Sequence, residues 1–193
     1  MPRRSQEYMD GQRLHFCEAA VACFRRKGVA ATNLTDICEE AGLSMGALYK
    51  FFDSRESLLE AVLQMRLNQR NEALHGKTWA KLRAALLRYA DDLSQDPFWR
   101  EIQGVVDWNE RLHALRVKEG RLILQQVKEQ IEQYTAAGEI APHFDARRTA
   151  QLISVVFDGA TSGIRTGSDL HVARKDLAAY FDFAVGRVEA EAD

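Results

Sequence analysis

Residues 32–58 of this 193-residue chain read TNLTDICEEAGLSMGALYKFFDSRESL. Apolar residues at helical spacing precede Gly42, and a second apolar set at the same spacing follows it. Ser44 offers a hydroxyl N-cap to the second helix. Two short helices joined by three or four residues that include a glycine describe a helix-turn-helix, so the stretch predicts that motif. The inward-facing apolar residues are Ile37, Cys38, Ala41, Leu48, Phe51 and Phe52.

The outer face of the second helix carries residues that suit contact with DNA. Small residues at its start, Gly46 and Ala47, allow close approach to a groove. Tyr49 and Lys50 lie behind them, where they can reach phosphates. The alternative is a packed pair of helices with no DNA role, because any such hairpin also needs a glycine turn.

The run resembles the DNA-binding domain of the TetR family of bacterial transcriptional regulators. The upstream segment LHFCEAAVACFRRKGVAAT, residues 14–32, resembles the first helix of that domain, which ends at a glycine before a threonine. The motif covers about a quarter of the chain, and the remainder resembles the family only in length and helical character. The matching residues are Thr32, Ile37, Ala41, Gly42, Leu43, Ser44, Gly46, Leu48, Tyr49, Phe52, Glu56 and Leu58.

Three positions depart from the family pattern. Met45 stands where a lysine is usual, Phe51 where a tyrosine or histidine is usual, and Arg55 where a lysine is usual. The first two changes remove polar groups that could touch DNA. Part of the family's contact set is therefore in doubt for this chain.

The resemblance implies a homodimeric repressor that binds a palindromic double-stranded DNA operator and leaves it when a small-molecule effector binds. An arm containing Arg3 and Arg4 could enter the minor groove. Met and Ala can read a thymine methyl but donate no hydrogen bond, so specificity would lean on DNA shape. The expected DNA-contact residues are Thr32, Ser44, Met45, Gly46, Ala47, Tyr49, Lys50 and Arg55.

Composition describes an ordinary globular protein, with 46% hydrophobic and 28% charged residues. The net charge of −2 does not by itself indicate a nucleic-acid-binding protein. No apolar run approaches the length of a membrane span, and the N-terminus shows no secretory pattern, so we expect a cytoplasmic protein without membrane contact. Cys17, Cys23 and Cys38 form no paired motif and are expected to be buried free thiols.

The rest of the chain reads as an all-α protein of about nine helices. We expect an N-terminal helix-turn-helix domain at 1–55 and a larger helical domain for effector binding and dimerisation at 56–193, with the fourth helix shared by both. Thr32 is the expected N-cap of the second helix, and Asp96 that of the sixth. The expected helices run from about 10 to 27, 32 to 41, 44 to 51, 53 to 75, from 78, from 96, then 112 to 136, 145 to 166 and 168 to 189.

The eighth predicted helix contains two glycines four residues apart, Gly159 and Gly163. Glycine inside a helix costs about 1 kcal/mol relative to alanine, and close contact with another helix is the usual compensation. In the resembled family the last two helices pair with their copies in a dimer. The alternative is that these faces pack inside one subunit. The expected dimer-interface residues are Gly159, Gly163, Leu177, Tyr180 and Phe181.

No pattern in the sequence favours catalysis. The five histidines lie far apart without metal-type spacing, and no nucleotide-binding glycine loop or nucleophile elbow occurs. We therefore expect no enzyme, no metal and no cofactor. A helical ligand-binding or adaptor protein that does not read DNA is the alternative function, favoured by the scarcity of cations on the reading helix.

Aromatic residues are crowded in the middle of the chain, where all three tryptophans fall between 79 and 108. Aromatic residues at helical spacing usually fill a core. Some could instead line an apolar effector cavity between helices, as the family resemblance implies. We expect an apolar or aromatic effector between the fifth and eighth helices, near Trp99, Trp108, His113, Tyr134 and Phe157.

Overall fold

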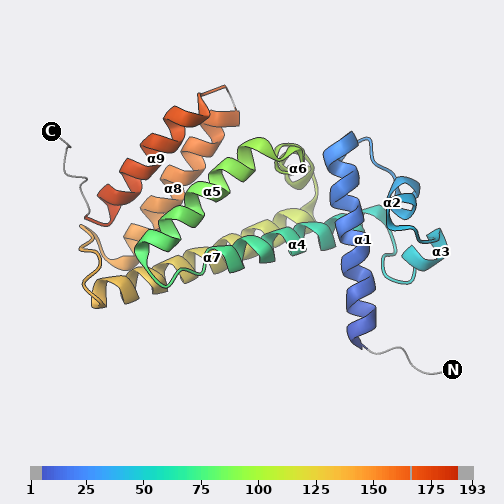
Figure 1. Ribbon diagram of the computed structural model, residues 1–193, viewed down its shortest axis with the longest axis horizontal. Coiled ribbons are helices and arrows are strands. Elements are labelled where there is room, and N and C mark those ends of the chain that lie inside the picture. Colours follow the sequence, from blue (N-terminus) through green and yellow to red (C-terminus); the bar gives the residue numbers. More distant parts are fainter. Residues whose placement is uncertain (1–5, 166, 187–193) are drawn as a thin grey trace. The chain divides into compact units, whose positions relative to one another are not determined.

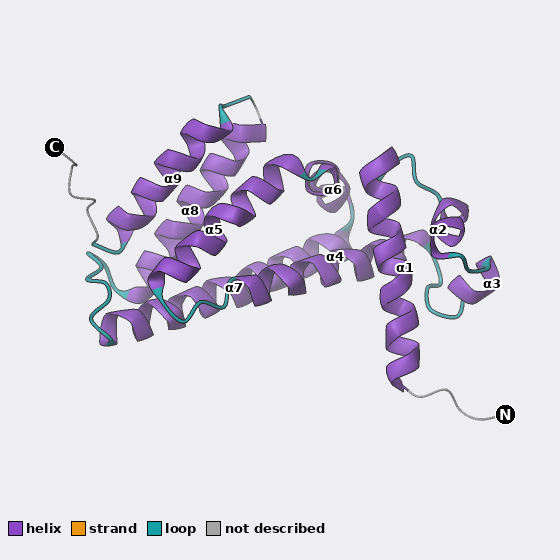
Figure 2. Ribbon diagram, viewed as in Figure 1, coloured by secondary structure: helices purple, strands orange, loops and turns teal. Residues whose placement is uncertain are grey.

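The computed structural model describes residues 6–165 and 167–186 (Figure 1). Over these residues every regular element is a helix, and nine helices are present (Figure 2). The all-α prediction is therefore confirmed. The helices are α1 (Gln6–Lys27), α2 (Leu34–Ala41), α3 (Met45–Leu48), α4 (Arg55–Ala73), α5 (Trp79–Gln95), α6 (Pro97–Trp108), α7 (Glu110–Ala136), α8 (Ala146–Arg165) and α9 (Leu170–Ala184).

One predicted cap was wrong. The N-cap of α2 is Asn33, whose side chain accepts a hydrogen bond from the Asp36 amide at 2.9 Å, while the Asp36 carboxylate accepts from the Asn33 amide at 3.0 Å. Thr32 cannot fill this role, because its hydroxyl donates to the Gly28 carbonyl at 2.7 Å. The predicted caps Ser44 and Asp96 are confirmed.

Several predicted helix ends also shift. The first helix begins at Gln6 rather than near residue 10, and α3 is α-helical only over Met45–Leu48, with turns continuing to 51. The seventh begins at Glu110, two residues early, and α9 ends at Ala184. The ends predicted at 166 and 189 lie outside the described residues.

The described residues form two compact units. The N-terminal unit comprises residues up to Asn68 together with Asp96–Leu115, and the C-terminal unit comprises Gln69–Gln95 together with the described residues from Arg116 onward. Both α4 and α7 run through both units. The assignment of roles to 1–55 and 56–193 stays a prediction, because compactness does not report function.

Aromatic side chains of α1 organise the core of the N-terminal unit. The ring of Phe16, which is fully buried, lies 6.0 Å from that of Phe51 and 6.3 Å from that of Phe52, centroid to centroid. Further along α1, the Phe24 ring stacks on Phe98 of α6 at 6.0 Å. The helix therefore presents one end to the helix-turn-helix and the other to α6, and burying such rings contributes roughly 1.5–3 kcal/mol each.

In the C-terminal unit α5, α8 and α9 pack side by side (Figure 1). Its core contains Trp79 of α5, Ile131 and Tyr134 of α7, and Phe181 of α9, all 2% exposed or less. Of the described helices, none is long and apolar enough to cross a membrane.

Polar side chains of α7 hold the connection between α4 and α5 in the C-terminal unit. Gln130 accepts from the Gly76 amide at 2.9 Å and donates to the Leu74 carbonyl at 3.2 Å. The Tyr134 hydroxyl lies 2.6 Å from the Gly76 carbonyl oxygen. Burial raises the pKa of Tyr134 to about 12, so the hydroxyl keeps its proton and remains a donor. These contacts satisfy backbone groups that the loop itself does not pair.

Candidate nucleic-acid interface

A tight turn joins α2 to α3 and sets the angle between them. Gly42 lies in the left-handed region at φ +64°, and its amide bonds to the carbonyls of Cys38 and Glu39. The Leu43 amide also bonds to the Cys38 carbonyl, at 3.0 Å. Ser44 then caps α3, accepting from the Ala47 amide at 3.2 Å. Only glycine adopts this φ without steric cost, so the sequence dictates the turn.

The face of α3 that points away from the core carries the predicted reading residues. Tyr49 is 53% exposed, and Gly46 and Lys50 are also exposed. Met45 and Ala47 are half-buried, and the Met45 sulfur contacts the Cys38 sulfur at 4.0 Å. The structure thus brings five of the predicted contact residues together on one short surface.

Two other predicted DNA-contact residues bond to the backbone instead. Thr32 is 2% exposed, with its hydroxyl on the Gly28 carbonyl. The Arg55 guanidinium donates to the carbonyl of Thr32 at 3.1 Å and to that of Val29. In this arrangement both side chains support the loop between α1 and α2, and their contact with DNA stays a prediction.

The peptide groups of Val29 are held from two sides. Its amide donates to Glu101 of α6 at 2.5 Å, and its carbonyl accepts from Arg55 at the start of α4. A side chain at Gly28 would meet the Glu101 carboxylate at 2.7 Å, and Gly28 has φ +83°. The sequence analysis did not identify Glu101; a surface glutamate carries no local signal for such a role.

The basic residues at the end of α1 form ion pairs within the N-terminal unit. Arg25 pairs with Asp96 at 3.2 Å, Arg26 pairs with Glu40 at 2.6 Å, and Lys27 pairs with Asp36. Hydrogen bonding from Lys27 is the largest cause that lowers the pKa of Asp36. Asp96 also pairs with Arg66 at 2.7 Å, so Arg25 shares its partner, and the ion pairs reduce the positive potential of the cluster without removing it. Lys50 is the cation that the described α3 surface itself offers. Arg3 and Arg4 lie outside the described residues.

The three cysteines are buried free thiols, as predicted. All three belong to α1 or α2. Burial raises the pKa of the Cys17 thiol to about 11, and the pKa values of Cys23 and Cys38 also rise for that reason. Among the described residues, no group of three or more side chains could hold a metal ion.

The predicted effector residues divide between the two units. Trp99, Trp108 and His113 belong to the N-terminal unit, whereas Tyr134 and Phe157 belong to the C-terminal unit. Trp99 is buried against Phe98 at 5.2 Å, whereas Trp108 is 93% exposed.

Tyr134 and Phe157 fill the core of the C-terminal unit. The Phe157 ring stacks on Tyr89 at 5.4 Å, and Tyr134 is 2% exposed. Neither residue lines the groove between α8 and α9 or the groove between α5 and α9. The sequence could not separate core aromatic residues from pocket-lining ones, because both follow the same helical spacing.

The predicted dimer residues divide by burial. Leu177 and Phe181 are fully buried within the C-terminal unit, so they face its own core. Gly159, Gly163 and Tyr180 line a groove of about 570 Å³ between α8 and α9, and Leu177 also contributes to its lining. Exposed apolar side chains of the same two helices are Val155, Val172, Tyr180 and Phe183.

The comparisons with known proteins agree with the geometry of the N-terminal unit. Residues 16–62 match the model of the bacterial regulatory proteins, tetR family. The HTH-type transcriptional regulator TtgR of Pseudomonas putida is 41% identical over 63 residues, which are 33% of this chain and 30% of that protein. YfiR of Bacillus subtilis, an uncharacterized HTH-type transcriptional regulator, is 29% identical over 99 residues, 49% of this chain and 46% of that protein. The matched segments thus span less than half the length of these relatives.

The likeness in three dimensions extends over most of the chain. SmeT, solved as a triclosan complex, superposes with a TM-score of 0.69 at 21% identity, covering 91% of this chain and 90% of that one. At this identity the superposition shows a shared fold. The family match therefore identifies residues 16–62, from α1 into α4, as a segment of the TetR type, and the superposition shows that the chain as a whole has the fold of such a protein.

Proposed function

We propose that the protein is a DNA-binding transcriptional regulator that represses genes from palindromic operators and is released by a small-molecule effector. The observation that carries the proposal is the exposed surface of α3, with Gly46, Tyr49 and Lys50 outward on a helix fixed by a glycine turn and a serine cap. The match of residues 16–62 to the family supports it. Such a protein works in the cytoplasm, where its DNA is.

Recognition combines one phosphate-directed cation with close approach. Lys50 and the Tyr49 hydroxyl are available to phosphates, which fix register without reading sequence. Met45 and Ala47 can meet thymine methyl groups. Because the cations at the end of α1 are ion-paired, we propose that DNA shape supplies much of the specificity.

We propose that a second copy covers the groove between α8 and α9, because a palindrome requires two reading helices about one DNA turn apart. The apolar residues exposed there, including Val172 and Tyr180, support this pairing. A Cβ at Gly159 would meet nothing within 4 Å inside the subunit. The glycine is therefore open within one copy, and a close helix of a second copy is a reason for keeping it.

We propose an apolar or aromatic effector that acts through the C-terminal unit, where Tyr134 and Phe157 lie. The triclosan complex of SmeT shows that a protein of this fold binds a small molecule, which supports the proposal. The effector must bind more tightly to the conformation that cannot hold DNA, since only differential affinity shifts an equilibrium. DNA must then weaken effector binding by the same factor.

The test of DNA binding is fluorescence anisotropy with the DNA upstream of the protein's own gene and with a shuffled duplex of equal length. We expect tighter binding to the upstream DNA. Lys50→Ala should weaken both and, if Lys50 neutralises one phosphate, flatten the plot of log affinity against log salt by about 0.9. Arg148→Ala, which removes a 73% exposed charge from α8, is the matched control and should change neither. Equal, weak binding to both duplexes would favour the adaptor function.

The test of dimerisation is sedimentation of wild type and Gly159→Leu. Since a Cβ at this position meets nothing within 4 Å in the subunit, the variant should fold and yet sediment as a monomer. A folded, dimeric Gly159→Leu protein would rule out a tight interface at this part of α8.

A further inference from the structure

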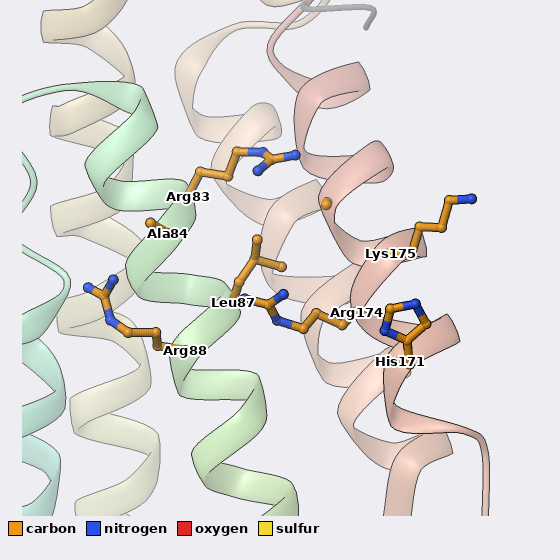
Figure 3. A pocket seen from close by; sticks show the side chains of 8 residues that line it. Arg83, Ala84, Leu87, Arg88, His171, Arg174 and Lys175 are labelled. Carbon is orange, nitrogen blue, oxygen red and sulfur yellow. The ribbon is translucent and has the colours of Figure 1, made fainter. Parts of the chain in front are cut away.

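A second groove of the C-terminal unit is lined almost entirely by cations and small apolar side chains. It lies between α5 and α9 and has a volume of about 430 Å³, within the size range of small-molecule sites. Figure 3 shows its lining, with Leu87 between the two helices. The lining residues are Arg83, Ala84, Leu87, Arg88, His171, Arg174, Lys175 and Ala178.

The charge of this groove is unlike that of the chain. The sequence has 28 acidic against 26 basic residues, so a random sample of surface would mix the two signs. Four of the eight lining residues are Arg or Lys, one is His, and none is acidic. Cations gathered in this way repel one another, because the groove is comparable in size to the screening length of about 8 Å. Binding of an anionic ligand would offset this repulsion and is the expected reason for the clustering of cations.

Two of the arginines are held in place by aspartates that lie outside the lining. Arg83 pairs at 2.6 Å with Asp182, which also accepts from the Trp79 indole at 3.3 Å. The Arg174 Nε lies 3.2 Å from Asp91. Figure 3 shows these two guanidinium groups between α5 and α9 on either side of Leu87. Each ion pair restrains its guanidinium group, and neither aspartate lines the groove.

The remaining cations stand at the rim of the groove. Arg88 and Lys175 are exposed and extend outward in Figure 3, and His171 opens the first turn of α9. After the two aspartates offset Arg83 and Arg174, the rim cations leave an excess of two positive charges. A phosphate monoester, with a charge of roughly −1.5 to −2 near neutral pH, matches that excess, whereas a carboxylate offsets half of it. Arginine forks also fit phosphate oxygens in pairs.

We infer that the groove between α5 and α9 binds a small organic phosphate, with the phosphate among Arg174, Arg88 and Lys175 and an apolar body over Leu87. Leu87, Ala84 and Ala178 supply the apolar floor on which a ring or short chain of the ligand rests. This site is separate from the α8–α9 groove and from the predicted effector residues, and it does not depend on DNA binding.

The test is calorimetric titration of the full chain at physiological salt with phenyl phosphate as the probe, with benzoate, phenol and inorganic phosphate in parallel. We expect phenyl phosphate to bind with a dissociation constant below about 1 mM. Inorganic phosphate should bind more weakly because it lacks the apolar body, and benzoate more weakly because it carries one charge. Binding of phenol or benzoate as tight as that of phenyl phosphate would overturn the inference, as would no binding of phenyl phosphate.

Matched variants locate the site. Arg88→Ala with Lys175→Ala removes two exposed cations of the rim and should weaken the binding of phenyl phosphate at least tenfold, since hydrogen bonds to charged groups are stronger than neutral ones. Lys118→Ala with Arg121→Ala removes the same charge from exposed positions of α7 and should leave affinity unchanged. Equal losses in the two double variants would mean that only net charge attracts the anion, and the groove would not be the site. Melting temperatures measured on both variants exclude unfolding as the cause.

Discussion

The helix-turn-helix and the C-terminal unit depend on contacts of very different sequence separation. The helix-turn-helix is defined by contacts between residues three to five apart: Asn33 with Asp36, Ser44 with Ala47, and Leu43 with Cys38. The C-terminal unit depends on contacts across the chain, such as Trp79 to Asp182 at a separation of 103 residues. A local motif is readable from a few residues, whereas long-range packing is not.

Thiol labelling should show the largest difference between the units, because all three cysteines lie in the N-terminal one. At pH 8 the folded protein should react with a thiol reagent at least about a hundred times more slowly at Cys17 than the protein in guanidinium chloride, since burial raises the pKa from 9.0 to about 11. The same shift stabilises the fold below pH 9, and this contribution falls as pH rises from 9.0 to about 11.

Labelling also tests whether the units unfold together. If Cys17 became reactive at denaturant concentrations where the C-terminal unit kept its helices, the helix-turn-helix would open alone. Equal rates in folded and denatured protein would contradict the burial of α1.

Removing one carboxylate should produce the next largest effect, in the C-terminal unit. Asp182→Ala deprives Arg83 and the Trp79 indole of their shared partner, and breaking such a nearly buried pair costs about 3 kcal/mol of unfolding free energy. Asp92→Ala, an exposed change on α5, should stay within about 0.5 kcal/mol of wild type. Chemical denaturation measures both. Equal stabilities of the two variants would show that this long-range contact does not support the unit.

The smallest effect compares one helix cap in each unit. Asn33→Ala removes the N-cap of α2. Asp169→Ala removes the N-cap of α9, because the Asp169 side chain accepts a hydrogen bond from the Val172 amide at 3.0 Å. Each should cost about 1 kcal/mol of unfolding free energy. Only Asn33→Ala should also weaken DNA binding, because α2 orients α3. A similar loss of DNA affinity in Asp169→Ala would contradict the proposal that the N-terminal unit alone contacts DNA.

The sequence predicted the helix-turn-helix because its determinants are local. Gly42 permits a left-handed turn and Ser44 offers a cap, and neither effect depends on distant residues. Even here one error arose: Thr32 and Asn33 are both competent caps, and the choice was made by the Gly28 carbonyl, which takes the Thr32 hydroxyl.

The contacts of the other site residues could not be predicted from the sequence, because they depend on which helices pack together. The apolar stripe of α9 was visible, but which part faces the core depends on α5 and α8, and Leu177 and Phe181 prove to be buried. In the same way, Arg55 was expected to meet phosphate, and only the folded loop reveals carbonyls within its reach. Helical spacing gives the face of a helix, but its partners come from the fold.

The most direct test of the proposed function is hydroxyl-radical footprinting of the DNA upstream of the gene with the wild-type protein. A dimer that places two copies of α3 in successive major grooves should protect two patches with centres about 34–36 Å, or 10 base pairs, apart. Tryptophan fluorescence in the same samples confirms that the protein is folded. Two such patches are the result we expect. A folded dimer that protects no region of this DNA at micromolar concentration would contradict the assignment of α3 as a reading helix.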